Sequence, residues 1–184
     1  MAGKTIDEVF QEVKRSWFVL PGYERWAEED IALPYINQST ISAPNVVKRM
    51  LELLDPKPHH KVLEVGTGSG YSTCLLSRLV DKVISIEVDP EVAQAAQRNL
   101  ERCGAKNVKV LVGDGKEGYP PEAPYDRILI NAAFPTIPPK LLEQLKEDGI
   151  LVMPLGPEGY QRLIRYSKKE GIKEDMAVVF IPLR

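Results

Sequence analysis

A buried strand that runs directly into a glycine-rich loop constrains the fold of this chain most. The apolar run 62–65 is followed by Gly66–Gly70, which reads Gly-Thr-Gly-Ser-Gly, and then by a helical pattern. Glycines let the backbone turn tightly and come close to a ligand, and the helix start offers unpaired N–H groups. The sequence therefore predicts a strand–loop–helix unit that suits a nucleotide-like cofactor.

A carboxylate at the end of the next strand narrows the class of cofactor. The apolar run 83–86 ends in Glu87, about 20 residues after the first glycine, where an acidic side chain can bind ribose hydroxyls. The dinucleotide fingerprint places its third glycine one residue later than this loop does, where Tyr71 stands. That difference weighs against a dinucleotide-dependent oxidoreductase.

Strands and helices alternate from Lys61 onward, which indicates an α/β fold with a doubly wound, mostly parallel sheet and helices on both faces. The last two apolar runs, 162–166 and 177–183, have no helix between them. The link 167–175 predicts an antiparallel hairpin at the C-terminal end of the sheet. We expect the other strands near 61–65, 82–87, 108–112, 126–130 and 149–155, and helices over 70–79, 90–103 and 138–146.

The 184 residues suit a single domain, in which an extension of residues 1–57 precedes an α/β core of residues 58–184. Thr5–Glu8 fits a capping box, so the extension begins with a helix. The stretch 22–44 is irregular, and such a long loop in a compact domain usually has a function. We expect this loop to cover the cofactor, and Ser42 to cap the helix that follows.

Composition argues against several other classes of protein. A formal net charge of −2, spread along the chain, disfavours nucleic acid as a partner. Without a transmembrane-length apolar stretch or a signal peptide, we expect a cytoplasmic protein with no membrane contact. Cys74 and Cys103 lie in predicted helices and are expected to be packing residues rather than a disulfide. His59 and His60 are expected to be exposed, and we expect no metal site.

The glycine loop and Glu87 resemble those of the class I methyltransferases, which bind S-adenosylmethionine on a Rossmann-like, seven-stranded sheet. The resemblance implies that Glu64 lies near the amino group of the methionine portion. Asp114 and Gly115 end a third strand, and the resemblance places them beside the adenine. The implied cofactor-binding residues are Glu64, Gly66, Thr67, Gly68, Ser69, Gly70, Glu87, Val88, Asp114 and Gly115.

The segment 31–44, with its Leu-Pro, short polar loop and Thr40-Ile41-Ser42, resembles the protein-L-isoaspartate O-methyltransferase family. Further matching pieces are 112–115, 124–126, 132–138, 149–156 and 180–183. This resemblance implies methyl transfer from S-adenosylmethionine to the α-carboxylate of L-isoaspartyl residues in damaged proteins, with S-adenosylhomocysteine as the product. It implies Ser42 as the catalytic residue and a substrate-binding set of Gln38, Thr40, Ile41 and Ser42.

The chemistry of a carboxylate acceptor suits these residues. A carboxylate with a pKa near ~4 is already ionised at neutral pH, so positioning, rather than a strong base, is what the enzyme must supply. Ser42 can orient it through a hydrogen bond. Two alternatives stay open: a class I methyltransferase that acts on a small molecule or RNA, and a noncatalytic cofactor-binding relative. We expect a monomer.

Overall fold

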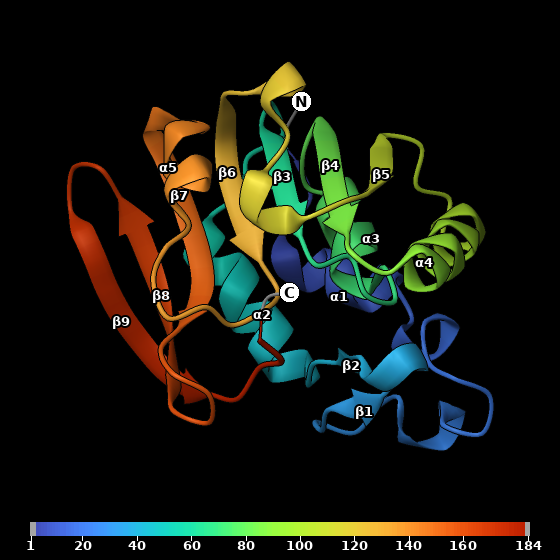
Figure 1. Ribbon diagram of the computed structural model, residues 1–184. Coiled ribbons are helices and arrows are strands. Elements are labelled where there is room, and N and C mark those ends of the chain that lie inside the picture. The colour runs from blue at the N-terminus through green and yellow to red at the C-terminus, as the bar shows by residue number, and fades with distance from the viewer. Residues whose placement is uncertain (1–2, 183–184) are drawn as a thin grey trace.

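A seven-stranded sheet forms the centre of the computed structural model, which describes residues 3–182 (Figure 1). Its strands are β3 (Lys61–Val65), β4 (Lys82–Glu87), β5 (Val108–Val112), β6 (Tyr125–Ile130), β7 (Leu145–Leu155), β8 (Gln161–Ser167) and β9 (Gly171–Val178). A separate pair, β1 (Leu33–Pro34) and β2 (Thr40–Ile41), forms a small antiparallel sheet. The helices are α1 (Ile6–Glu12), α2 (Pro44–Leu54), α3 (Tyr71–Ser77), α4 (Pro90–Arg102) and α5 (Pro139–Glu143).

Five short 3-10 turns complete the secondary structure: η1 (Arg15–Trp17), η2 (Glu24–Trp26), η3 (Ile36–Gln38), η4 (Gly115–Glu117) and η5 (Pro120–Glu122). Thr5 caps α1 as predicted, because its hydroxyl accepts the N–H of Glu8 at 3.1 Å. None of the helices in residues 3–182 combines the length and the apolar composition that a membrane span requires.

The strand order is β5-β4-β3-β6-β7-β8-β9. The strands from β5 to β7 in this order are parallel, whereas β7, β8 and β9 pair antiparallel. This arrangement confirms the predicted α/β fold, with its mostly parallel sheet and antiparallel C-terminal hairpin. Figure 1 shows the small β1–β2 sheet beyond the carboxyl ends of the central strands.

Two apolar cores lie on opposite faces of the sheet. Successive strand residues point to opposite faces, so the buried neighbours Val62 and Leu63 belong to different cores. Helices α1 to α4 contribute to the Val62 core, whereas α5 and the turn around η5 contribute to the Leu63 core. Helices therefore cover both faces, as predicted, although α5 is the only α-helix among the described residues on the second face.

Several predicted boundaries are wrong at the C-terminal end: the strand expected at 149–155 begins at Leu145, and the strand expected at 177–183 ends at Val178. The helix expected over 138–146 ends at Glu143, because Leu145 already pairs with Tyr125 as part of β7. The last strand begins at Gly171, six residues before its predicted start at 177. Its first half is charged, which hides a strand from apolar patterning, but β9 is an edge strand with an exposed face, where charges are common.

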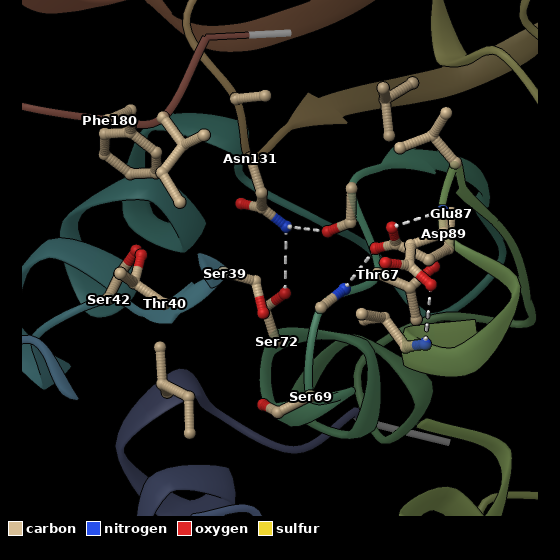
Figure 2. A pocket seen from close by; sticks show the side chains of 18 of the residues that line it. Ser39, Thr40, Ser42, Thr67, Ser69, Ser72, Glu87, Asp89, Asn131 and Phe180 are labelled. Atoms are coloured by element: carbon tan, nitrogen blue, oxygen red, sulfur yellow. Dashed lines mark hydrogen bonds between the residues drawn. The ribbon is translucent and has the colours of Figure 1, made fainter. Parts of the chain in front are cut away.

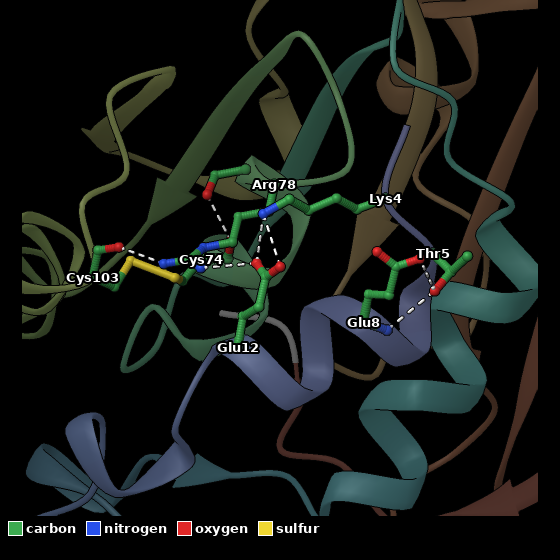
Figure 3. A network of polar contacts seen from close by, with 8 residues as sticks. Lys4, Thr5, Glu8, Glu12, Cys74, Arg78 and Cys103 are labelled. Carbon is green, nitrogen blue, oxygen red and sulfur yellow. Dashed lines mark hydrogen bonds and ion pairs between the residues drawn. A yellow bond between two sulfur atoms is a disulfide. The ribbon is translucent and has the colours of Figure 1, made fainter. Parts of the chain in front are cut away.

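The two cysteines form a disulfide, contrary to expectation. Cys74 of α3 is bonded to Cys103, the residue that follows α4, and both are buried (Figure 3). The two helices pack on the same face of the sheet, and this proximity could not be read from a separation of 29 residues along the chain. Arg78 joins α1 to the same place by donating to Glu12 at 3.1 Å and to the Cys103 carbonyl at 2.8 Å.

His60 is buried rather than exposed. Its Nδ1 accepts the N–H of Lys57 at 2.9 Å, and only His59 is left on the surface, as expected. Burial, and next the positive charge of Arg127, lowers the pKa of His60 from 6.5 to about 4. The imidazole is therefore neutral in the folded protein at pH values where it is partly protonated in the unfolded chain.

This difference predicts an acid-sensitive contribution to stability. Below pH 6.5 the unfolded chain takes up a proton at His60 that the folded protein takes up only near pH 4. The free energy of unfolding should therefore fall between these two pH values, by at most about 1.4 kcal/mol per pH unit. Urea unfolding at pH 7.5 and 5 should show a smaller loss for His60→Asn, which keeps an acceptor for Lys57 but does not titrate.

His59→Gln is the matched control, and it should show the same loss as the wild type. An equal loss in His60→Asn and the wild type would contradict the assignment.

Candidate functional site

One cavity lies at the carboxyl ends of the parallel strands, with an empty volume of about 1050 Å³, part of which is open to solvent. Strand order reverses at β3, because β4 lies on one side of it and β6 on the other. In open α/β sheets such a reversal leaves a crevice where ligands bind. The predicted site residues that line the cavity are Thr40, Ile41, Ser42, Gly66, Thr67, Gly68, Ser69, Glu87, Val88 and Gly115.

The predicted substrate segment and the predicted cofactor loop thus face the same space. Figure 2 shows Thr40 and Ser42 on one side of the cavity, and Glu87 and Asp89 on the other. Four predicted site residues are not part of the lining: Gln38, Glu64, Gly70 and Asp114.

Glu87 organises the glycine loop. One of its carboxylate oxygens accepts the N–H of Gly68 at 2.9 Å, and the other accepts the N–H of Asp89 at 3.0 Å. Gly66 has a φ of +90°, a backbone conformation that residues with a side chain rarely adopt. The loop and the carboxylate are therefore held together before any ligand is considered.

Glu64 lies behind the cavity wall rather than in it. Its fully buried carboxylate accepts hydrogen bonds from Ser72, Thr73, Ser85 and Asn131. Burial raises the pKa of Glu64, and these four hydrogen bonds oppose the rise. Ser72 and Asn131 themselves line the cavity, where Figure 2 shows them joined by a hydrogen bond, so Glu64 reaches the site through them.

Gly115 and Asp114 are neighbours with different environments. Gly115 is buried in the lining, where a Cβ would overlap the side chain of Val65. The Asp114 side chain is 43% exposed and accepts the N–H of Lys116 at 3.0 Å, so it caps η4. Asp114 therefore has the turn-capping role that Asp-Gly sequences commonly have, and glycine at 115 lets the loop approach β3 closely.

Ser42 does not cap α2. The N-cap is Ala43, which has no capping side chain, and Pro44 occupies the first turn. The hydroxyl of Ser42 belongs to the cavity lining instead. Pairing of β1 with β2, through Leu33 with Ile41, brings this part of the chain over the site.

Side-chain contacts join the predicted substrate segment, 31–44, to the predicted cofactor loop and to the start of α4. Asn37, in the left-handed region at φ 53°, donates to Asp89 at 2.8 Å and to Glu91 at 3.0 Å, near the start of α4. Deeper in the protein, the Asn99 amide donates to the Tyr35 hydroxyl at 3.3 Å and to the Ser69 carbonyl at 2.9 Å.

Several residues of the lining were not predicted from the sequence. Asn37, Ser39 and Ser72 carry no motif of their own. The C-terminal residues Phe180 and Ile181 also line the cavity, and the Ile181 carbonyl accepts the N–H of Ala133 at 2.8 Å. The segment 180–183 was among the pieces that resemble the family, and this resemblance was the one sign in the sequence that Phe180 and Ile181 could belong to the site. Leu183 lies outside the described residues.

Among residues 3–182, no group of three or more His, Cys, Asp or Glu side chains is placed to hold a metal ion.

Comparison with known proteins identifies the family. The model for "Protein-L-isoaspartate(D-aspartate) O-methyltransferase" matches residues 1–184. The chain belongs to this family. The protein-L-isoaspartate O-methyltransferase of Methanoculleus marisnigri is 46% identical in an alignment of 176 residues that covers 94% of this chain and 80% of that protein. The enzyme of the same name from Pyrococcus horikoshii is 45% identical, with 97% of this chain and 84% of that protein covered.

Solved structures agree on the fold. A structure titled protein-L-isoaspartate O-methyltransferase superposes with a TM-score of 0.87 at 29% identity and covers 96% of this chain. This chain spans 60% of that protein's length. A Plasmodium falciparum structure, titled as a putative family member in complex with S-adenosyl-L-homocysteine, gives a TM-score of 0.80 at 23% identity and covers 97% of this chain and 89% of that chain.

The buried carboxylate yields a prediction. In Glu64→Gln an amide NH₂ replaces an oxygen that accepts hydrogen bonds, which leaves buried donors unpaired and should lower the free energy of unfolding by about 1–3 kcal/mol. Ser72 and Asn131 lose their anchor, so calorimetry should show weaker binding of S-adenosylhomocysteine.

Glu143→Gln, at an exposed position of α5, is the control and should change neither quantity. A destabilised Glu64→Gln protein that binds S-adenosylhomocysteine as tightly as the wild type would show that Glu64 does not support the cavity wall.

Proposed function

We propose that this chain transfers a methyl group from S-adenosylmethionine to the α-carboxylate of L-isoaspartyl residues in damaged proteins, with S-adenosylhomocysteine as the product. The observation that carries the proposal is the shared cavity, in which Thr40 and Ser42 face the glycine loop and Glu87. The curated relatives bear the name of this activity.

The residues of the cavity fit the cofactor. Each Glu87 oxygen accepts one backbone N–H and has a further lone pair for a ribose hydroxyl. Gly66, Gly68 and Gly115 allow close approach of the backbone to the ligand. Asn131 and Ser72 would hold the methionine portion, with Glu64 behind them. When bound, the cofactor supplies a methyl group on a positively charged sulfur.

On the substrate side, we propose that Ser42 donates a hydrogen bond to the α-carboxylate and that Thr40, Ile41 and Gln38 complete the substrate contacts. The carboxylate is ionised at neutral pH and attacks without a general base. A neutral hydroxyl orients it without stabilising the ground state as strongly as an arginine would. The start of α2, an 11-residue helix, adds partial positive charge nearby.

Repair then continues without further enzyme chemistry. The methyl ester has a better leaving group than the free carboxylate, so the adjacent peptide nitrogen can displace methanol and close a succinimide. Hydrolysis of that ring returns part of the material to normal aspartate. Contact between Asp114 and the adenine, a monomeric state and a cytoplasmic location remain predictions from the sequence.

The test is methyl transfer to two synthetic peptides that differ only in an isoaspartyl or an aspartyl linkage. With radiolabelled S-adenosylmethionine, we expect base-labile labelling of the isoaspartyl peptide alone. Equal labelling of both peptides, or labelling of neither, would overturn the proposed function.

Ser42→Ala tests the role of the hydroxyl in the same assay. We expect kcat/KM for the isoaspartyl peptide to fall about 10- to 100-fold. A hydrogen bond to a charged group contributes about 1.5–3 kcal/mol, and its loss lowers the rate by about this factor. Ser16→Ala, outside the cavity lining, is the matched control. Unchanged kcat/KM in Ser42→Ala would remove Ser42 from the mechanism.

A further inference from the structure

Arg15 carries a buried charge close to the proposed carboxylate site. The residue begins the short turn η1 and is only 4% exposed. Its two terminal nitrogens donate to five backbone carbonyls, those of Ala27, Glu29, Ile31, Ile41 and Ser42. The shortest of these contacts joins Nη2 to the Ile31 oxygen at 2.7 Å, and the contact with the Ser42 oxygen is 3.1 Å.

Those carbonyls belong to a segment with little regular structure. Between η2 and α2, the only backbone ladder is the two-residue pairing of β1 with β2. The carbonyls of Ala27 and Ile41 are buried at their contacts with Arg15, and the other three are partly buried. A guanidinium offers several donors in a planar fork, so one side chain can satisfy several such carbonyls. The Arg15 guanidinium therefore binds both the chain before β1 and the chain at the end of β2.

A buried guanidinium is costly unless it is well satisfied. Burial lowers the pKa of Arg15, and negative charge at Asp30 and Glu28 is among the influences that oppose this. Both terminal nitrogens of Arg15 donate to carbonyls, whereas its Nε is buried and has no hydrogen-bond partner among the described residues.

The contacts bear directly on Ser42. Arg15 holds the carbonyl of Ser42 and that of Ile41, which precedes it, so the peptide units on both sides of the Ser42 Cα are fixed. The direction of a side chain follows from the backbone that carries it. Asp30 adds a second anchor, because its carboxylate accepts the N–H of Asn45 in the first turn of α2 at 2.9 Å.

We propose that Arg15 is a positioning residue for methyl transfer, which fixes the backbone at Ile41 and Ser42 so that the Ser42 hydroxyl is held toward the substrate carboxylate. The proposal rests on the proposed function. Arg15 is not in the cavity lining, so it acts through Ser42 and not on substrate or cofactor.

Arg15→Lys is the informative variant, because it keeps the positive charge but presents its donors from one point and cannot span the five carbonyls. With the isoaspartyl peptide, we expect KM to rise about tenfold and kcat to fall. The dissociation constant of S-adenosylhomocysteine should stay within twofold of the wild type, because the glycine loop and Glu87 are untouched.

Arg127→Lys is the matched control. Arg127 is also a buried arginine, 8% exposed, and donates to the carbonyls of Leu54 and Asp55 at the far end of α2. It should lose stability in a thermal melt without a change in peptide KM. If Arg15 had only a structural role, Arg15→Lys would likewise lose stability and keep the wild-type peptide KM. A folded Arg15→Lys protein with wild-type KM and kcat for the peptide would therefore overturn the proposal.

A double-mutant cycle tests whether Arg15 acts through Ser42. In the Ser42→Ala background, Arg15→Lys should lower kcat/KM by less than twofold further, because the group that Arg15 positions is already missing. Full additivity of the two effects would overturn the proposal, as would equal losses of peptide and S-adenosylhomocysteine binding in Arg15→Lys.

If Arg15→Lys does not fold, Asp30→Ala replaces it. This variant releases the same segment from α2, and we expect a smaller rise in peptide KM with S-adenosylhomocysteine binding unchanged; no rise would overturn the proposal. A wild-type chain that does not methylate the isoaspartyl peptide overturns the proposed function and this inference with it. An active wild type with unaffected variants overturns the inference alone.

Discussion

The reversal of strand order at β3 is the constraint on which the site depends. Strands β4 and β6 both run parallel to β3, one on each side of it, so the carboxyl ends of all three strands lie together at one end of the sheet. The chain continues from these ends in different directions. The glycine loop follows β3, Glu87 ends β4 and Asn131 follows β6. The buried Glu64 carboxylate draws these parts together, since its donors come from α3, β4 and the end of β6.

The two sides of the cavity are built differently. The cofactor side rests on the sheet, with its apolar residues buried on both faces and its loop held by backbone hydrogen bonds to Glu87. The proposed substrate side is an irregular segment whose only backbone ladder is the two-residue pairing of β1 with β2, and polar side chains from elsewhere in the chain also hold it: Arg15 from η1 and Asn99 from α4.

Patterns along the chain predicted the parts that local physics decides. The strands near β3, β4 and β5 follow from apolar runs, and the glycine loop follows from spacing. What failed depends on contacts between distant residues. Which helices and loops become neighbours decides three features that the sequence did not predict. These are the disulfide of Cys74 with Cys103, the burial of His60 and the contacts of the Arg15 guanidinium with distant carbonyls. Likewise, Ser42 and Ala43 are one residue apart, and only the backbone decides which one caps α2.

A crystal structure of the chain with S-adenosylhomocysteine and an isoaspartyl peptide tests the account most directly. We predict the nucleoside against Glu87 and the glycine loop, and the peptide α-carboxylate in the same cavity, about 3 Å from the Ser42 hydroxyl. A carboxylate bound outside this cavity, or S-adenosylhomocysteine bound away from Glu87, would contradict the claim that the two sides form one methyl-transfer site.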